Sequence, residues 1–421
     1  MSSLPRILYF FSRSVVCAPL LAAVALLAAS QSGAGSQDDK VHVNQIQVIG
    51  SHNSYHIGMG ANEMKFLRQR NAQAAVGLDY SHPALDVQFN QGIRQIELDV
   101  FSDAKGGRYS HPAWPRLMRQ GGLEPDPDFD PQHLFDKPGF KVMHVQDLDY
   151  RSNCEPFTSC LQVVRSWSQA HPNHLPLFLL IETKEGWERQ DFMTKPEPFT
   201  TEVFDALDAE IRSVFHENEI ITPDRIRGNH STLEEAVLTD GWPTLREARG
   251  KVIFLMDQRK ARDAYIQGHP SLRGRIIFTN ALPGEPDAAF VEVNDPQEIQ
   301  EAKEASEKNE TPDAKEAKKE DPKPSRIPEL IKKGYLVRTR TDADLVQARK
   351  NDTSTREAAM ASGAQMLSTD FPFSDKADTG YAVDFPQSLI ARCNPVSAPS
   401  GCKSELLEPH MRRITVKTPL R

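Results

Sequence analysis

Residues 93–100 have the sequence Ile-Arg-Gln-Ile-Glu-Leu-Asp-Val, and this stretch decides the fold class. Side chains alternate between the two faces of a β-strand, so Glu97 and Asp99 point the same way, and the apolar residues around them indicate a buried strand. Neighbouring carboxylates repel each other unless a cation or a proton lies between them. The stretch therefore predicts a buried strand with a site for a hard metal ion at its carboxyl end. Two exposed acids on a sheet edge are the alternative.

Similar short apolar or β-branched runs recur along the chain and alternate with stretches of helical periodicity, which is typical of a parallel sheet covered by helices. Eight such runs lie at residues 45–49, 93–100, 140–145, 177–181, 251–256, 274–279, 335–340 and 364–369. Residues 158–170 and 198–214 are expected to be covering helices. Eight strands within about 330 residues predict an α/β fold, a single (β/α)8 TIM-type barrel with loop insertions, whose chemistry lies at the carboxyl ends of the strands.

The N-terminal region has the outline of a cleaved signal peptide. Arg6 and Arg13 precede an apolar run at 18–29 and small polar residues at 30–36. The apolar run is shorter than the roughly 20 residues that span a bilayer, so a membrane anchor is the weaker interpretation. We therefore expect residues 1–36 to be removed, with an approximate cleavage position, and the protein to be secreted or periplasmic.

The cysteines agree with export. Of the five, Cys17 lies within the predicted signal peptide. The even number that remains favours disulfides, most simply Cys154 with Cys160 and Cys393 with Cys402, although four cysteines allow three connectivities. A zinc site is the alternative, but neither pair has CxxC spacing.

The rest of the mature chain divides into a barrel domain and two accessory segments. We assign residues 44–390 to the barrel and residues 391–421 to a C-terminal extension. Residues 300–326 are dominated by Glu, Lys, Asp and Ala. This segment has almost no large apolar side chain to bury, so we predict a flexible insertion between the sixth and seventh strands, with a solvated helix as the alternative.

Polar side chains follow three other predicted strands. The first strand runs into Gly-Ser-His-Asn-Ser-Tyr, which places His52 and Asn53 where the strand meets its loop. The third strand ends at His144, and the fourth places Glu182 and Lys184 on one face. A lone histidine such as His144 is more often structural. We treat it as a candidate because it ends the predicted strand that follows the paired acids. Neighbouring strands of a closed barrel bring these groups into one pocket.

Such a pocket suits displacement at phosphorus, because a metal ion neutralises developing charge while an acid and a base serve the leaving and attacking oxygens. His52 and His144 are the candidate catalytic residues, and Lys184 is a candidate substrate-binding residue. The candidate metal ligands are Asn53, Glu97, Asp99 and Glu182. Oxygen ligands of this kind indicate calcium, with magnesium second.

The seventh predicted strand places Arg338 and Arg340 on one face near the same end of the barrel. Guanidinium groups match phosphate oxygens bidentately, so both are candidate substrate-binding residues. An ion pair with Asp342 or Asp344 is the structural alternative. Asp370, at the end of the eighth strand, is a weaker candidate because it is equally suited to cap the segment that follows.

Together these residues resemble the calcium-dependent phosphatidylinositol-specific phospholipases C, particularly their compact exported microbial branch. The matching pieces are residues 50–55, residues 92–100, His144, Glu182 and residues 363–372 (Gly-Ala-Gln-Met-Leu-Ser-Thr-Asp-Phe-Pro). The likeness extends over most of residues 44–373.

The resemblance implies a TIM-type barrel in which the inositol 2-hydroxyl of phosphatidylinositol attacks phosphorus, releasing diacylglycerol and a cyclic inositol phosphate. It also implies that calcium binds the four candidate ligands, and that His52 and His144 stabilise the transition state and exchange protons. His144 is the favoured acid toward the leaving oxygen, and Glu97 or Glu182 is the base. A phospholipid at a membrane or micelle surface is thus the expected partner.

The net charge of −8 argues against nonspecific nucleic-acid binding, and we expect a monomer without a stable protein partner. A glycerophosphodiester phosphodiesterase is the nearest alternative function, since that family shares the barrel, the paired acids and a Glu-x-Lys on strand four. Against it, the first strand ends His-Asn-Ser rather than His-Arg-Gly, and no aspartate follows His144 directly. An inactive exported binding barrel is the alternative of another class, and the complete set of candidate residues argues against it.

Overall fold

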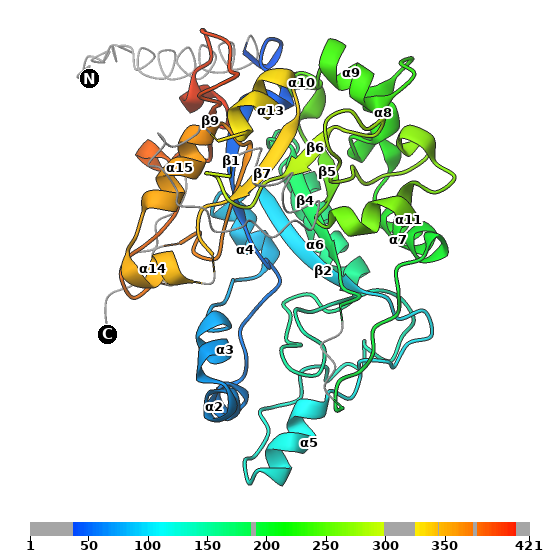
Figure 1. Ribbon diagram of the computed structural model, residues 1–421, viewed down its shortest axis with the longest axis vertical. Helices are drawn as coiled ribbons and strands as arrows, with labels where there is room; N and C mark the ends of the chain where they lie inside the picture. Colours follow the sequence, from blue (N-terminus) through cyan, green and yellow to red (C-terminus); the bar gives the residue numbers. More distant parts are fainter. Residues whose placement is uncertain (1–36, 187–190, 299–324, 344, 374–376, 410–421) are drawn as a thin grey trace, which may run out of the picture.

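Figure 1 shows the computed structural model, which describes residues 37–186, 191–298, 325–343, 345–373 and 377–409. The predicted signal peptide and nearly all of the insertion predicted at 300–326 lie outside the described residues. Within them, no helix has the length and apolar composition needed to cross a membrane.

A parallel sheet in the order β5–β4–β2–β1–β8–β7–β6 forms the centre of the molecule. Its strands are β1 (Ile46–Ser51), β2 (Gln95–Phe101), β4 (Leu177–Thr183), β5 (Val252–Met256), β6 (Phe290–Glu292), β7 (Leu336–Arg340) and β8 (Met366–Thr369). Parallel bridges from Leu255 to Phe278 and from Asn280 to Phe290 continue the sheet between β5 and β6. Residues 278–280 therefore take the eighth position of a nearly closed barrel, and the predicted TIM-type fold is confirmed.

β2 is buried along its whole length, as the predicted central strand requires. It pairs with β1 on one side and with β4 on the other, so the alternative of two acids on a sheet edge is excluded. The register places Asp99 beside Glu182 and Glu97 beside Leu180.

The strand predicted at residues 140–145 is not part of the barrel wall. Only Lys141–Val142 (β3) are paired, and they lie antiparallel to the end of β2, with Val142 opposite Val100. The apolar run is explained by burial, because Val142 packs into the main core and Met143 into a smaller one. β6 was missed because a strand of three residues is too short to show a period.

Helices cover the outside of the sheet. They are α4 (Leu85–Asn90), α6 (Phe157–Ala170), α7 (Thr201–Val214), α8 (Pro223–Arg227), α9 (Leu233–Thr239), α10 (Leu245–Ala248), α11 (Arg262–Ile266), α13 (Ile327–Lys333), α14 (Val346–Lys350) and α15 (Ser354–Ser362). Both predicted covering helices are confirmed as α6 and α7. Thr200 caps α7 by accepting a bond from the Val203 N–H, and Leu207 and Ile211 are buried against the barrel.

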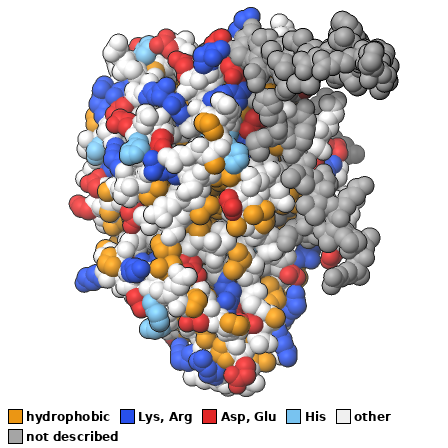
Figure 2. All heavy atoms as spheres, turned by 180° about the vertical axis from the view of Figure 1, so that it is seen from behind, with side chains coloured by type: hydrophobic (Ala, Val, Ile, Leu, Met, Phe, Trp, Pro, Cys, Tyr) orange, Lys and Arg blue, Asp and Glu red, His pale blue; other side chains and the backbone are white. Residues whose placement is uncertain are grey.

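A small lobe lies beyond the barrel at the lower end of Figure 1, where α2 (Ala61–Arg70), α3 (Ala72–Gly77) and α5 (Ala113–Gln120) are grouped. It has its own apolar core, which includes Phe66, Trp114 and Tyr150. In the view of Figure 2, from the opposite side, acidic and basic side chains are interspersed over the surface.

The C-terminal extension packs against the barrel within the described residues. β9 (Ala391–Cys393) lies antiparallel to β1, and Glu408 forms a bidentate ion pair with Arg94, which has no exposed surface. The two disulfides are those predicted, Cys154–Cys160 and Cys393–Cys402.

Candidate active site

One cavity of about 670 Å³ lies at the carboxyl ends of the barrel strands and gathers most of the candidate residues. Its lining includes His52, Asn53, His144, Glu182, Lys184 and Arg340. They come from the ends of β1, β4 and β7 and from the loop after β3, so the tertiary structure brings together residues that are far apart in the chain.

Three carboxylates converge beside this cavity. Glu97, Asp99 and Glu182 each offer an oxygen atom, and these oxygens lie within 4.8 Å of one another. Glu97 and Asp99 are fully buried on β2, whereas Glu182 is partly exposed on β4. Two acids of one strand face thus meet a third from the neighbouring strand, as the alternation of side chains predicts.

The acids are destabilised as anions. Burial raises the pKa of Glu97 to about 8, although the nearby Arg338 guanidinium opposes the shift. Burial and the charge of Glu182 raise the pKa of Asp99 well above its usual range. Lys184 Nζ lies 3.0 Å from one Asp99 oxygen, yet neither oxygen forms a well-directed hydrogen bond within the described part of the chain. A buried carboxylate left in this state is suited to bind a cation.

Asn53 is oriented by its neighbours. Its backbone is left-handed, with φ of 47°, and its Nδ2 donates a 2.7 Å hydrogen bond to the Tyr80 hydroxyl. Its Oδ1 accepts only a long 3.5 Å bond from the Tyr55 hydroxyl among the described residues. Burial and the charge of Asp99 raise the pKa of Tyr55, so this hydroxyl also lies near the carboxylates. The three carboxylates therefore form an oxygen-donor set that fits a hard divalent cation such as Ca²⁺, and the amide oxygen of Asn53 lies near the Tyr55 hydroxyl beside them.

His52 forms a pair with Asp370. Its Nδ1 lies 2.6 Å from Asp370 Oδ1, and its Nε2 lies 3.4 Å from Glu97 Oε1. Arg340 binds the other oxygen of Asp370 at 2.8 Å. Burial and the charge of Arg340 lower the pKa of His52 to about 3. Asp370, a weaker candidate on sequence grounds, thus orients the imidazole instead of only capping a segment.

His144 forms a second pair, with Asp149, which the sequence interpretation missed. Its Nδ1 lies 2.9 Å from Asp149 Oδ2. A tight turn brings the carboxylate back, because the backbones of Val145 and Asp149 exchange two hydrogen bonds of 2.9 and 3.0 Å. The only sequence signal was the spacing His-x₄-Asp, which is common and lacks specificity.

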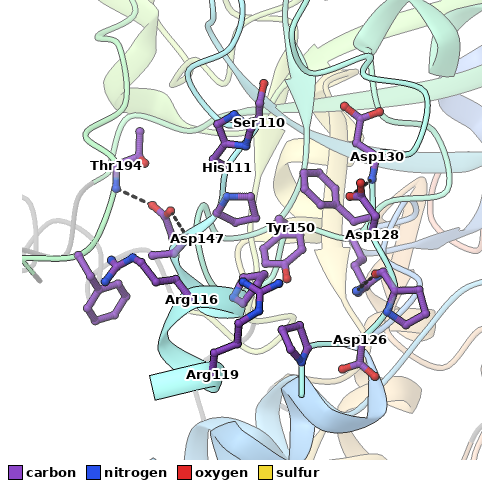
Figure 3. A pocket seen from close by; sticks show the side chains of 18 of the residues that line it. Ser110, His111, Arg116, Arg119, Asp126, Asp128, Asp130, Asp147, Tyr150 and Thr194 are labelled. Carbon is purple, nitrogen blue, oxygen red and sulfur yellow. Dashed lines mark hydrogen bonds between the residues drawn. The ribbon is translucent and has the colours of Figure 1, made fainter. Parts of the chain in front are cut away.

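The turn that carries Asp149 is anchored by Asp147, at a second cavity of about 570 Å³ shown in Figure 3. Asp147 Oδ1 accepts a 2.8 Å bond from the Ala113 N–H and Oδ2 accepts a 2.5 Å bond from the Thr194 N–H. Other acids there also bind the backbone: Asp126 accepts from Asn62 and Glu63. Asp147 thus bonds the start of α5 and Asp126 the start of α2, whereas the carboxylates beside the first cavity face one another.

The two arginines of β7 differ in depth. Arg338 is buried and donates to Glu97 at 2.7 Å and to Glu292 at 3.1 Å, so its guanidinium lies under the carboxylates rather than in the cavity lining. Arg340 lines the cavity, paired chiefly with Asp370 and more distantly with Asp342, at 3.9 Å. Asp344, the other ion-pair partner proposed from the sequence, lies outside the described residues.

Comparison with known proteins identifies a family for this chain. The family model for phosphoinositide phospholipase C, Ca²⁺-dependent, matches residues 41–307 and 303–395. A structure of a Ca²⁺-dependent phosphatidylinositol-specific phospholipase C from Streptomyces antibioticus is 17% identical, covering 78% of this chain and 95% of that chain, with a TM-score of 0.46. A calcium-dependent enzyme from Pseudomonas sp. is 14% identical, covering 85% of this chain and 96% of that chain, with a TM-score of 0.46. No curated protein sequence gives a match.

Proposed function

Because the chain belongs to the family of Ca²⁺-dependent phosphoinositide phospholipases C, we propose that it cleaves phosphatidylinositol to diacylglycerol and a cyclic inositol phosphate. One observation supports this reaction above the others. Two imidazoles, each bound to a carboxylate through Nδ1, lie beside a cluster of three further carboxylates. Such a set supplies an acid, a base and a cation site for displacement at phosphorus.

The proposed metal is Ca²⁺, with Mg²⁺ second, held by Asn53, Glu97, Asp99 and Glu182. These residues offer hard oxygen donors, and the buried oxygens of Asp99, which have Lys184 beside them but accept no well-directed hydrogen bond among the described residues, favour a bound cation. When bound, the ion would neutralise negative charge that develops on the phosphate oxygens.

The two histidines have different proposed roles: His52 stabilises the transition state at phosphorus, and His144 is the acid. Asp370 accepts from Nδ1–H of His52, which leaves Nε2 beside Glu97, and Glu97 or Glu182 is the proposed base toward the inositol 2-hydroxyl. Asp149 accepts from Nδ1–H of His144, and in the doubly protonated imidazolium form of His144 the proton on Nε2 would pass to the leaving glycerol oxygen. Proton donation at that oxygen breaks its bond to phosphorus as the new bond to the 2-hydroxyl oxygen forms.

Two cations at the cavity are proposed to bind the phosphate. Arg340 is fixed by Asp370 at 2.8 Å, and Lys184 is fixed by Asp99 at 3.0 Å and Glu182 at 3.2 Å. Each side chain has additional N–H groups that its carboxylate partners do not fully use. The predicted signal peptide would direct export of the protein. The exported protein would then meet its phospholipid substrate at a membrane or micelle surface.

An assay of the purified protein on phosphatidylinositol, phosphatidylcholine and glycerophosphoinositol tests the proposal. We expect calcium-dependent release of diacylglycerol from phosphatidylinositol alone, and no release in excess chelator. Cleavage that survives chelation, or consumption of glycerophosphoinositol only, would overturn it, the second result in favour of a glycerophosphodiester phosphodiesterase. No turnover of any substrate would favour a binding barrel.

A further inference from the structure

A third imidazole lies behind the His144–Asp149 pair. His56, in the loop after β1, has no exposed surface, and its Nε2 lies 3.0 Å from Asp149 Oδ1 and 2.9 Å from Oδ2. His144 Nδ1 lies 2.9 Å from the same Oδ2. One buried carboxylate thus binds two imidazoles, of which His144 lines the cavity and His56 does not.

Both imidazole nitrogens lie at hydrogen-bond distance from the Asp149 oxygens, and this arrangement favours the ionised carboxylate, because only the anion can accept on both oxygens without a proton of its own. Burial by itself would raise the pKa of Asp149, but the charge of His56 and the hydrogen bonds from both histidines hold it well below its usual range. An ionised carboxylate in the interior is stable only when its oxygens are paired. His56 provides one of those pairings from within the protein.

The ring of His56 is itself held in place. Its backbone N–H donates to Asn53 O at 2.9 Å, and its carbonyl accepts from His82 N–H at 2.7 Å. Its ring packs on Tyr80, with 4.3 Å between the centroids, and lies edge-on to His144 at 5.8 Å. Tyr80 in turn accepts a hydrogen bond from Asn53, a proposed metal ligand. The packed rings of His56 and Tyr80 therefore contact both Asn53 and the proposed acid, His144.

We propose that His56 is a positioning residue for the phosphodiester cleavage: it fixes Asp149, so that Asp149 holds Nδ1–H of His144 and His144 Nε2 faces the cavity. This inference rests on the proposed function of His144. His56 acts without touching substrate. When its Nε2–H is lost, Asp149 is free to turn, and His144 populates the other tautomer and other ring orientations, which lowers the fraction of productive complexes.

Two amide variants of His56 are equally polar but place the side-chain nitrogen at different distances from the backbone. In His56→Gln the side-chain nitrogen can occupy the position of Nε2, whereas in His56→Asn it reaches only the position of Nδ1. We expect His56→Asn to lower kcat on phosphatidylinositol by about 10-fold or more, with KM changed by less than about 2-fold, and His56→Gln to retain most of the wild-type kcat. His174→Asn is the matched control, because His174 is also buried but bonds Ser168 and Leu175 away from the cavity.

Two further readouts distinguish positioning from a general loss of structure. In a His144→Ala background, His56→Asn should change kcat by less than about 2-fold, since residues that act as a unit are not additive. Imidazole ¹⁵N shifts of His144, recorded without substrate, should show Nδ1–H in the wild-type and His56→Gln proteins and a tautomer mixture in His56→Asn. Equal kcat in the Gln and Asn variants, an additive double variant, or an unchanged His144 tautomer would each overturn the inference. Because the tautomer needs no substrate, it tests the inference even if phosphatidylinositol is not cleaved.

Discussion

His52 and Asp370 are separated by 318 positions in the chain, and their side chains meet with 2.6 Å between His52 Nδ1 and Asp370 Oδ1. Closure of the barrel makes this possible, since β1 pairs with β8 and Ser51 lies opposite Thr369. The first and the last barrel strands thus each supply one half of a single functional pair.

Asp370→Asn should therefore disturb the orientation of the His52 imidazole without removing any of its atoms. The amide no longer accepts strongly from Nδ1–H of His52, so we expect kcat on phosphatidylinositol to fall by about 10²-fold. Asp378→Asn, at an exposed position, is the control. A loss below about 3-fold would show that Asp370 serves structure alone.

Asp99→Asn should weaken calcium binding. The variant keeps the shape of the side chain but removes one charge from the three-carboxylate cluster, so the half-saturating calcium concentration should rise by about 10-fold or more. Calorimetric titration and the calcium dependence of turnover both measure it. The exposed Glu405→Gln is the control, and an identical titration for Asp99→Asn would place the ion elsewhere.

The two arginines of β7 should respond differently to substitution. Arg340→Lys keeps a charge at the cavity but loses the planar fork, and we expect a rise in KM or a fall in kcat with little change in Tm. Arg338→Met leaves Glu97 and Glu292 without their buried cation, and should lower the free energy of unfolding by about 3 kcal/mol. Thermal unfolding and steady-state kinetics on both variants would separate the roles. The same response from both would contradict the difference in depth.

The stability of the protein should depend on pH through Glu155. Burial, together with the charges of Asp130 and Asp128, raises the pKa of Glu155 to about 7 from 4.5. The folded state then binds more protons than the unfolded state between these values, so this contribution is present below pH 4.5 and is lost as the pH rises toward 7. Glu155→Gln should show a smaller decline in Tm over this range than wild type, whereas the exposed Glu124→Gln should follow wild type.

The C-terminal extension should be needed for stability. Glu408 is bonded to the fully buried Arg94 at 2.8 and 2.9 Å, and Glu408→Gln leaves that charge poorly compensated. We expect a loss of about 3 kcal/mol in the free energy of unfolding, measured by denaturant titration. Replacing both partners, with Arg94→Met and Glu408→Leu, should cost less than the single change, and a larger loss in the double variant would argue against this account.

Much of the site could be predicted because local rules govern it. The period of two in a strand places Glu97 and Asp99 on one face, and the strand register adds Glu182 beside them. The same rule placed Arg338 and Arg340 on one face, but it does not say how deep each side chain lies in the barrel. That depth makes Arg338 a buried ion-pair partner of Glu97 and Arg340 a residue of the cavity lining. His144 was expected at the end of a barrel strand, and it lies in the same cavity although its segment only forms a short antiparallel pair with β2.

The sequence by itself determined the TIM-type barrel and the paired acids of β2, because period, spacing and composition express local constraints on the backbone. It favoured the two short disulfides without fixing their connectivity. Only the tertiary structure decided the partners of the two histidines. Asp370 reaches His52 through barrel closure, and Asp149 reaches His144 and the buried His56 through a turn held by Asp147. Hydrogen bonds between side chains depend on distances of a few tenths of an ångström, and such distances are set by packing rather than by position in the chain.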